Sequence, residues 1–211
     1  MTFRYLVLAS VGLGACLAQQ YEIGGAAGGG FAKGGSVTAA AGTAAAGFQS
    51  GPAFGFVLGH RMYRLMSGEV RYGFLKHDLK LESGGQSPTF GAQAHAVHYD
   101  ILFHPGEFGK GDVQPFVAAG GGMKVYRGTG KEAAYQPLSN FAYLTKTQDV
   151  RPMLSVGGGV KVKLGPRMWL RTEFRDYVTP FPKKVITPAR GAKISGWVHD
   201  IVPMVGISFM F

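Results

Sequence analysis

The six histidines are the first residues to consider as metal ligands or catalytic bases. His95 and His98 are three positions apart, which on a β-strand places them on opposite faces, so one metal ion cannot bind both. His98 and Asp100, two positions apart, share a face and are able to pair. No two histidines have a third ligand at a suitable spacing, and the sequence therefore predicts no metal site and no cofactor.

A hydrolytic site needs a nucleophile, a base and an acid, and one short segment contains all three. Ser195, His199 and Asp200 form this set, although the adjacent His199 and Asp200 face opposite ways on a strand. Six histidines and many serines produce such combinations by chance. We therefore predict no catalytic residue and no enzyme activity, and this set remains the basis of an alternative.

Charged residues that alternate with apolar ones form a third set. Val70 and Tyr72 share one strand face while Glu69 and Arg71 share the other, and the same alternation recurs elsewhere. Three acids and three bases lie within a few residues of short turns, so they are expected at one level of the fold. The set is Glu69, Arg71, Asp100, Lys161, Arg171 and Glu173. Balanced charges are able to neutralise each other when buried, which predicts a structural polar network rather than an ion path.

The elements that carry these residues are eight predicted strands. Their ranges are 21–31, 50–62, 66–82, 88–104, 113–126, 150–164, 168–179 and 194–211. The connections after the second, fourth and sixth strands are short, whereas the others are intermediate or long. Alternation of short and long connections is typical of an antiparallel up-and-down barrel in an outer membrane. The fold class is therefore all-β, an eight-stranded antiparallel up-and-down transmembrane β-barrel.

Two glycine triplets repeat at an offset of 37 residues. Gly120–Gly122 follow Val113-Gln114-Pro115-Phe116, and Gly157–Gly159 follow Val150-Arg151-Pro152-Met153. Glycines within strands indicate sharp curvature or the close approach of other groups. We expect lumen side chains to approach the backbone at these positions.

The first 18 residues have the pattern of a secretory signal. Arg4 is basic, residues 5–17 are apolar, and Ala18 precedes Gln19 at a suitable cleavage site. The predicted domains are a signal peptide at 1–18 and an outer-membrane barrel at 19–211. Lipidation of Cys16 remains an alternative. After the signal, no apolar run is long enough for a transmembrane helix.

The chain closes on an alternating strand that ends in an aromatic residue. We interpret Gly206, Ile207, Phe209 and Phe211 as an assembly signal that barrel-assembly machinery reads. With an exported start and an even strand count, this predicts integral insertion in the bacterial outer membrane after signal cleavage.

The chain is basic, with a formal net charge of +10, but its charges are scattered rather than clustered. This excludes nucleic acid as the expected partner. Outer-membrane lipids, including the phosphates of lipopolysaccharide, fit an exported basic chain better. The oligomeric state stays undetermined.

Long connections are where barrel function usually lies. Aromatic and basic residues of the segments 127–149 and 180–193 are the candidate loop contacts. They are Lys131, Tyr135, Tyr143, Lys183, Lys184 and Arg190. The Gly/Ala/Thr-rich segment 36–46 is expected to be a mobile loop.

Three pieces of the sequence resemble a known family. They are Val-Gln-Pro-Phe-Val-Ala-Ala-Gly-Gly-Gly at 113–122, Leu-Arg-Thr-Glu-Phe-Arg-Asp-Tyr at 170–177 and Gly-Ile-Ser-Phe-Met-Phe at 206–211. The chain resembles the small eight-stranded outer-membrane barrels of the OmpA, OmpX and opacity-protein group, and is close to uncharacterised outer-membrane barrels. The resemblance implies the barrel architecture but hardly any activity.

The predicted function is a structural or surface-interaction role, exercised through extracellular loops above a lumen filled by side chains. Three alternatives remain open: a small channel, an outer-membrane lipid-modifying enzyme, and a soluble exported lipocalin-like ligand binder. In the last of these the polar strand faces would point outward instead of inward.

Overall fold

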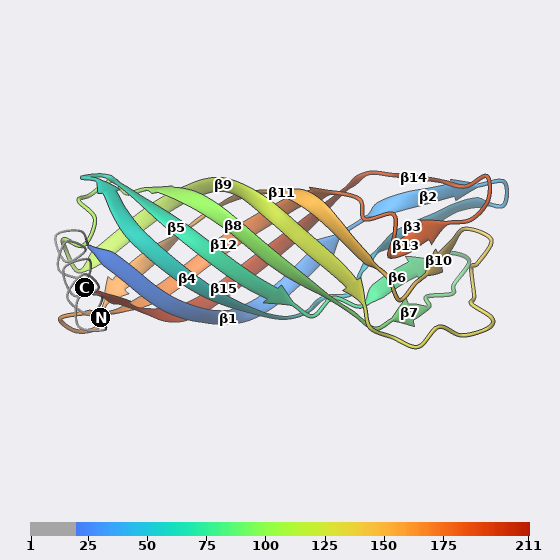
Figure 1. Ribbon diagram of the computed structural model, residues 1–211, viewed down its shortest axis with the longest axis horizontal. Helices are drawn as coiled ribbons and strands as arrows, with labels where there is room; N and C mark the ends of the chain where they lie inside the picture. The colour runs from blue at the N-terminus through green and yellow to red at the C-terminus, as the bar shows by residue number, and fades with distance from the viewer. Residues whose placement is uncertain (1–19) are drawn as a thin grey trace, which may run out of the picture.

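The computed structural model describes residues 20–211, in which eight strands form a closed antiparallel barrel (Figure 1). Each strand pairs with its sequence neighbour among the eight, and the first pairs with the last. Around the barrel they are β1 (Tyr21–Lys33), β4 (Gly51–Tyr63), β5 (Met66–Leu75), β8 (Ala92–Phe103), β9 (Val113–Gly128), β11 (Gln148–Lys163), β12 (Met168–Pro180) and β15 (Trp197–Met210). The predicted fold class and up-and-down order are confirmed.

Period-two alternation gives the barrel an apolar outer wall. Phe54, Val97, Val117, Leu154 and Phe174 point outward, and each is 53–62% exposed. Such a belt of exposed apolar residues would be unstable in water but suits lipid. Among residues 20–211 no helix is long and apolar enough to cross a membrane.

The length of the outer belt can be followed along β15. Phe209 faces outward near one end of this strand, and His199 faces outward near the other. These residues are ten positions apart, which at about 3.3 Å per residue and a tilt of about 40° corresponds to about 25 Å along the barrel axis. His199 bonds Asp176 on the neighbouring strand, with 2.9 Å between Nδ1 and Oδ2. The belt is therefore as tall as the hydrocarbon layer of a membrane, and the His199–Asp176 pair lies at the edge far from Phe209.

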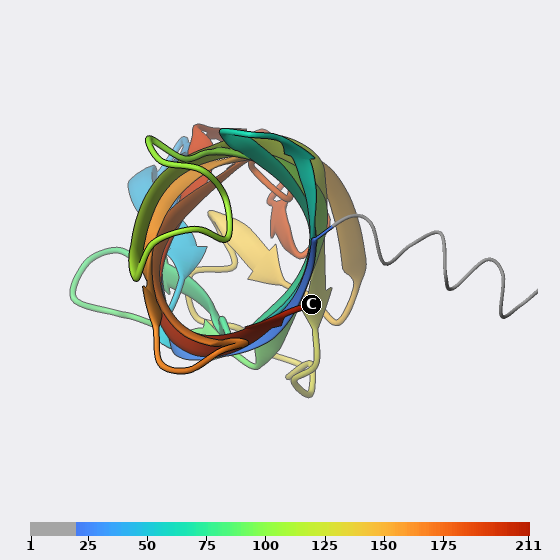
Figure 2. The ribbon, with the colours of Figure 1, turned by 90° about the vertical axis from the view of Figure 1, so that its left-hand side faces the viewer.

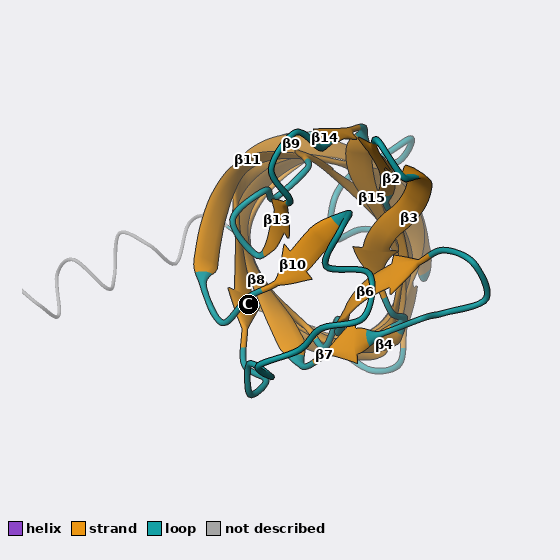
Figure 3. Ribbon diagram, turned by 90° about the vertical axis from the view of Figure 1, so that its right-hand side faces the viewer, coloured by secondary structure: helices purple, strands orange, loops and turns teal. Residues whose placement is uncertain are grey.

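The two ends of the barrel differ. Short segments at 64–65, 104–112 and 164–167 connect strands at the end that we call the turn end, which faces the viewer in Figure 2. Four longer segments, 34–50, 76–91, 129–147 and 181–196, lie together at the opposite end and form what we call the cap (Figure 3).

The cap contains its own β-structure. One sheet has the order β14-β2-β3-β6-β7 and a second pairs β10 with β13. Their bounds are β2 (Gly35–Ala39), β3 (Gly42–Phe48), β6 (Leu79–Glu82), β7 (Thr89–Phe90), β10 (Ala142–Leu144), β13 (Ile186–Pro188) and β14 (Lys193–Ser195). Apolar side chains from all four cap segments, among them Val37, Leu79, Phe141 and Ile186, belong to one buried cluster that continues into the cap-side half of the barrel.

Four expectations about this end were wrong: three strand ranges and one loop. The predicted strands 66–82 and 88–104 combine a barrel strand with a cap strand, because β5 ends at Leu75 and β8 begins at Ala92. The predicted last strand likewise combines β14 with β15. The segment 36–46 is not a loop: it forms most of the β2–β3 hairpin, which is paired with β14 on one side and β6 on the other. Its buried Val37, Ala44 and Ala46 explain why small residues are needed there.

Candidate functional site: a charged lumen beneath an apolar cap

The turn-side half of the lumen holds a network centred on two glutamates. The Arg171 guanidinium donates to both carboxylate oxygens of Glu69, at 2.6 and 2.7 Å. Lys161 and Arg71 also donate to Glu69, at 3.3 and 3.1 Å. Glu173 accepts from Arg171 Nε at 3.0 Å and from both terminal nitrogens of Arg71. All five side chains are buried, so the structure brings together five of the six residues expected to meet in the lumen.

Asp100, the sixth, lies beside this network. Its carboxylate accepts from Arg175 at 2.7 Å and pairs with His98 Nδ1 at 2.9 Å. Arg175 also reaches Glu69 and Glu173, with N···O distances of 3.8 and 3.5 Å. Arg175 therefore joins Asp100 to the other charges.

Sequence reasoning omitted two members of the network, Arg175 and Glu22. Arg175 lies on the same strand face as Arg171 and Glu173, so the alternation alone was a sufficient signal for it. Glu22, on β1, accepts from Lys161 and from Arg171, the latter at 3.4 Å. The signal for Glu22 was weaker, because it is the single acid in a glycine- and alanine-rich strand.

A second polar group lies nearer the cap. Lys124 donates to Asp200, whose other oxygen lies 3.1 Å from His77 Nδ1, and all three side chains are fully buried. The Lys124 ammonium also lies over the rings of Tyr126 and Tyr177, at 5.1 and 5.9 Å from their centroids. Sequence analysis did not find this group, since Lys124, Asp200 and His77 come from three distant segments.

The buried charges of the lumen balance. Five carboxylates and five cations are buried in the lumen. They are Glu22, Glu69, Asp100, Glu173 and Asp200 against Arg71, Lys124, Lys161, Arg171 and Arg175. Asp149 is also buried, but it pairs with Arg151 at the cap end, at 2.7 Å. Balance and mutual hydrogen bonding satisfy charges that would be costly to bury singly.

Glycines make room for this filling. A Cβ on Gly120 would lie 2.3 Å from Asp100 Oδ1, and one on Gly122 would lie 2.6 Å from His98 Cβ. On the other triplet, a Cβ on Gly157 would meet Arg175 Cδ at 2.8 Å. The expected approach of lumen side chains at the glycine triplets is confirmed.

Apolar side chains lie at both ends of the polar lumen. Phe108, Trp169 and Met210 form a buried cluster at the turn end, and Lys161 lies over the Phe108 ring. The cap cluster covers the other end. This arrangement opposes a continuous water path.

The ionisable group most affected by burial outside the strands is His104, in the turn 104–112. Burial, followed by the nearby Lys161 ammonium, lowers the pKa of His104 to about 4. Its Nε2 lies 2.9 Å from the Ser67 hydroxyl. In the cap, burial alone would raise the pKa of Asp78, but hydrogen bonds from Lys76 and the Ala92 amide outweigh it, and the pKa is lowered.

The candidate catalytic set is not assembled. His199 points outward to Asp176, whereas Asp200 points into the lumen to Lys124, and Ser195 lies near Ser36 at 3.5 Å between hydroxyl oxygens. His95 and His98 are likewise on opposite faces, since His95 bonds Tyr72 on the outer wall. No group of three metal-ligating residues occurs within 20–211.

The candidate loop contacts all lie on the cap surface. Tyr135 is 78% exposed, Tyr143 on β10 is 46% exposed, and Lys131, Lys183, Lys184 and Arg190 are exposed as well. Two cap segments are held together near Lys184, because the Thr145 and Thr147 hydroxyls both donate to its carbonyl at 2.7 Å. Lys146, between those threonines, therefore lies close to Lys183 and Lys184.

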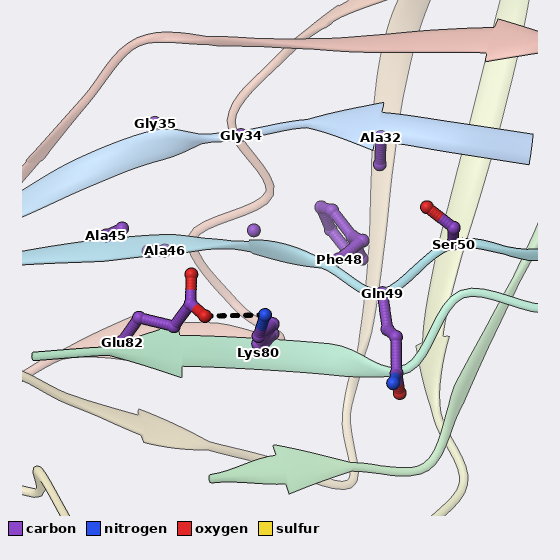
Figure 4. Close-up of a pocket in the computed structure, with 11 residues that line it drawn as sticks. Ala32, Gly34, Gly35, Ala45, Ala46, Phe48, Gln49, Ser50, Lys80 and Glu82 are labelled. Carbon is purple, nitrogen blue, oxygen red and sulfur yellow. Dashed lines mark ion pairs between the residues drawn. The ribbon is translucent and has the colours of Figure 1, made fainter. Parts of the chain in front are cut away.

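A groove of about 550 Å³ also lies in the cap (Figure 4). Small residues such as Gly35 and Ala46 line it on β2 and β3, and the Lys80–Glu82 ion pair, at 2.6 Å, lies along β6. The groove therefore carries one compensated pair and no excess charge.

The residues expected to form the assembly signal lie on the seam of the barrel. Ile207, Phe209 and Phe211 are exposed on the outer wall at 44–60%. Gly206 packs against β1, where a Cβ would lie 2.2 Å from the Gly25 carbonyl. Phe211 exchanges backbone hydrogen bonds with Tyr21.

Comparison with known proteins gives matches in fold. No protein-family model matches the chain. No curated protein matches it in sequence. Among solved structures, OprG from Pseudomonas aeruginosa matches with a TM-score of 0.59 and 12% identity, over 92% of this chain and 95% of that one. Neisserial surface protein A matches with a TM-score of 0.56 and 13% identity, over 91% and 97%.

A protease is also among the matches: OmpT from Escherichia coli, with a TM-score of 0.52 and 9% identity, over 91% of this chain and 97% of that one. At these identities the likeness concerns the fold alone and transfers no activity. The chain thus has the fold of the small outer-membrane β-barrels, as the sequence resemblance implied.

Proposed function

We propose that the protein is an integral outer-membrane barrel with a structural lumen, and that its cap binds the anionic headgroups of lipopolysaccharide. The cap would face the outside and the turn end the periplasm, the usual arrangement of long and short connections. The observation that carries the proposal is the distribution of charge between the lumen and the two ends.

The neutral lumen leaves the excess charge of residues 20–211 at the ends. The cap and the adjoining strand ends have a net charge of +6, twice the +3 of the turn end. The basic residues on the cap side are Lys33, Lys76, Lys80, Arg127, Lys131, Lys146, Arg151, Lys183, Lys184, Arg190 and Lys193, and the acidic ones are Asp78, Glu82, Glu132, Asp149 and Asp176. This charge lies next to the layer where lipopolysaccharide carries its phosphates.

Ion pairs divide the cap cations into two groups. Lys76, Lys80 and Arg151 have carboxylate partners, whereas no ion pair is found within residues 20–211 for the exposed lysines 146, 183 and 184. The Thr145 and Thr147 contacts hold these three lysines together. Glu132 and Asp149 accept from the Lys146 and Lys184 backbone amides, at 2.6 and 3.0 Å, so with Arg151 the local surface has four cations against two carboxylates and keeps a net charge of +2. Each such cation near an anionic membrane surface contributes about 1 kcal/mol.

The test compares the native chain with a Lys146→Gln, Lys183→Gln, Lys184→Gln variant. Both are incorporated into vesicles, and binding of labelled lipopolysaccharide is measured at low and physiological salt. We expect about 100-fold weaker binding for the variant at low salt, and a smaller difference when salt screens the charges. The control is the Arg64→Gln, Lys163→Gln, Arg167→Gln variant, which removes three exposed turn-end cations for which no ion pair is found among the described residues.

Equal binding by the triple variant and the native chain would show that the cap charge does not recognise lipopolysaccharide. Membrane location is tested separately by fractionating expressing cells and comparing unheated and heated samples on a denaturing gel. Recovery in the outer membrane with a heat-shifted band is expected. Recovery as a soluble periplasmic protein would refute the membrane assignment.

A further inference from the structure

A pocket at the turn end has no role in the proposed function. It has a volume of about 250 Å³ and lies between the start of β1 and the two turns at 104–112 and 164–167. Gln20, Lys163 and Arg167 supply its polar groups, while Trp169 and Met210 supply apolar surface. Trp169 and Met210 also belong to the cluster at the mouth of the lumen, so the pocket has a packed floor.

The two cations of this pocket lack acidic partners. Lys163 and Arg167 are exposed, and no ion pair involving either is found among the described residues, the Phe211 carboxylate included. Outside the pocket, Glu107 pairs with Arg61 at 2.8 Å and with Lys110 at 3.1 Å, while Arg64 is a single exposed cation without an ion pair among the described residues. Two positive charges thus line one pocket without a carboxylate of the described residues at ion-pair distance.

Gln20 gives a second, independent indication of a missing ligand. Its amide oxygen is buried and has no hydrogen-bond partner in the described structure. The amide packs on Gly109, where a Cβ would lie 2.7 Å from that oxygen. A buried polar atom without a partner is uncommon and costly. Rotation of the Gln20 amide toward the pocket would bring this oxygen within reach of a donor on a bound ligand, such as a hydroxyl.

The surroundings of the pocket identify the chemistry of the ligand. Phe211 lines the pocket and Leu164 follows the lining residue Lys163 in the chain; they are 60% and 50% exposed, at the turn-end edge of the apolar belt. A suitable ligand therefore carries a negative charge, a hydroxyl-bearing headgroup and an apolar tail. We propose that this pocket binds the headgroup of an anionic phospholipid of the inner leaflet, such as phosphatidylglycerol. The phosphate would lie at Lys163 and Arg167, and the glycerol near Gln20.

This inference rests on the orientation in the proposed function, which places the turn end at the periplasmic leaflet. It does not depend on lipopolysaccharide binding at the cap. The two fail separately: a chain recovered in the outer membrane that does not bind phosphatidylglycerol refutes only this inference.

The chain provides its own reporter, because it has two tryptophans and one of them lines the pocket. Trp197 is 56% exposed at the cap end, so Trp197→Phe leaves Trp169 as the only indole without disturbing a buried contact. The full chain with this substitution, in non-ionic detergent, is titrated with dihexanoyl phosphatidylglycerol while Trp169 emission is recorded. Dihexanoyl phosphatidylcholine and glycerol 3-phosphate are titrated in parallel.

We expect saturable binding of phosphatidylglycerol, tighter than that of phosphatidylcholine or glycerol 3-phosphate. Lys163→Gln or Arg167→Gln should each weaken it about fivefold, and the double variant about 30-fold. Arg64→Gln, an exposed turn-end cation outside the pocket, is the matched control and should leave binding unchanged. The heat-shifted gel band verifies that every variant is folded.

Three results would overturn the proposal. Equal affinity for the two phospholipids would remove the charge selectivity. Equal affinity for glycerol 3-phosphate would mean that a soluble phosphate, not a lipid, is the ligand. Unchanged binding in the folded double variant would show that Lys163 and Arg167 do not hold the phosphate.

Discussion

Glu69→Gln is the substitution that tests the lumen network most directly. The side chain keeps nearly the same shape, so the change removes a charge rather than volume. The Glu69 carboxylate is completely buried and accepts from Arg71, Lys161 and Arg171. An amide accepts through one oxygen only, and its NH₂ group would point donors at neighbouring cations.

The expected loss follows from the charge count. Removing one of five buried carboxylates leaves five cations with four partners in a low-dielectric interior. Removal of one member of a buried ion pair typically costs about 3–5 kcal/mol. We therefore expect Glu69→Gln to lower the free energy of unfolding by at least 3 kcal/mol. Glu82→Gln, the same substitution in an ion pair at the cap surface, should have no measurable effect.

The assay is reversible unfolding by urea from lipid vesicles, followed by tryptophan emission and by the heat-shifted gel band. If Glu69→Gln does not fold, the double variant with Lys161→Met restores the balance of charge and should recover part of the folded yield. A Glu69→Gln variant as stable as the Glu82→Gln control would refute the reasoning that lumen charges must balance. A double variant whose loss of stability equals the sum of the losses caused by Glu69→Gln and Lys161→Met alone would also refute this reasoning.

Further outcomes are expected elsewhere in the fold. Gly120→Ala should sharply reduce the folded yield on gels, because its Cβ would lie 2.0 Å from the Tyr99 carbonyl oxygen. Gly106→Ala is the control, since a Cβ there would have no atom within 4 Å and should leave the yield unchanged. Equal yields of the two variants would contradict this expectation. Since the pKa of His104 is about 4 when folded and 6.5 when unfolded, the unfolded chain takes up the proton first, and stability should fall as pH drops from 6.5 to 4. Urea titrations at several pH values should show that the stability of His104→Gln falls less steeply with decreasing pH than that of the native chain. The same pH dependence in both would exclude His104 as the cause. Phe48→Ala should lower the stability of the cap by about 3–5 kcal/mol and make it sensitive to limited proteolysis, while the barrel keeps its heat-shifted band. Protease resistance equal to that of the native chain would show that Phe48 does not hold the cap together.

The barrel was predictable from sequence because lipid and lumen impose opposite polarities on alternate residues. Met168 to Arg175 alternate without interruption, and the strand boundaries found there match those expected. The glycine triplets were informative for a related reason, since a Cβ on Gly120 or Gly157 would meet both a carbonyl of the adjacent strand and the lumen side chain of Asp100 or Arg175.

The cap was not predictable in this way. Its strands are short, and its core is assembled from four segments far apart in the chain, so no local period marks it. Residues 36–46 have a composition typical of a flexible loop, yet their burial depends on β6 and β14. The Lys124–Asp200–His77 group was missed for a similar reason, since only the closed barrel brings these residues together.

The pairing of β1 with β15 has a consequence for the order of folding. Glu22 enters the lumen on the first strand, but β1 is fixed on one side only until the last strand pairs with it. Before closure, Lys161 and Arg171 face a lumen still open to water at the seam. Their contacts with Glu22, across sequence separations of 139 and 149 residues, form only when the ends of the chain meet. Contacts this distant form slowly, so the drying of the lumen should be the final, rate-limiting event of assembly rather than its start.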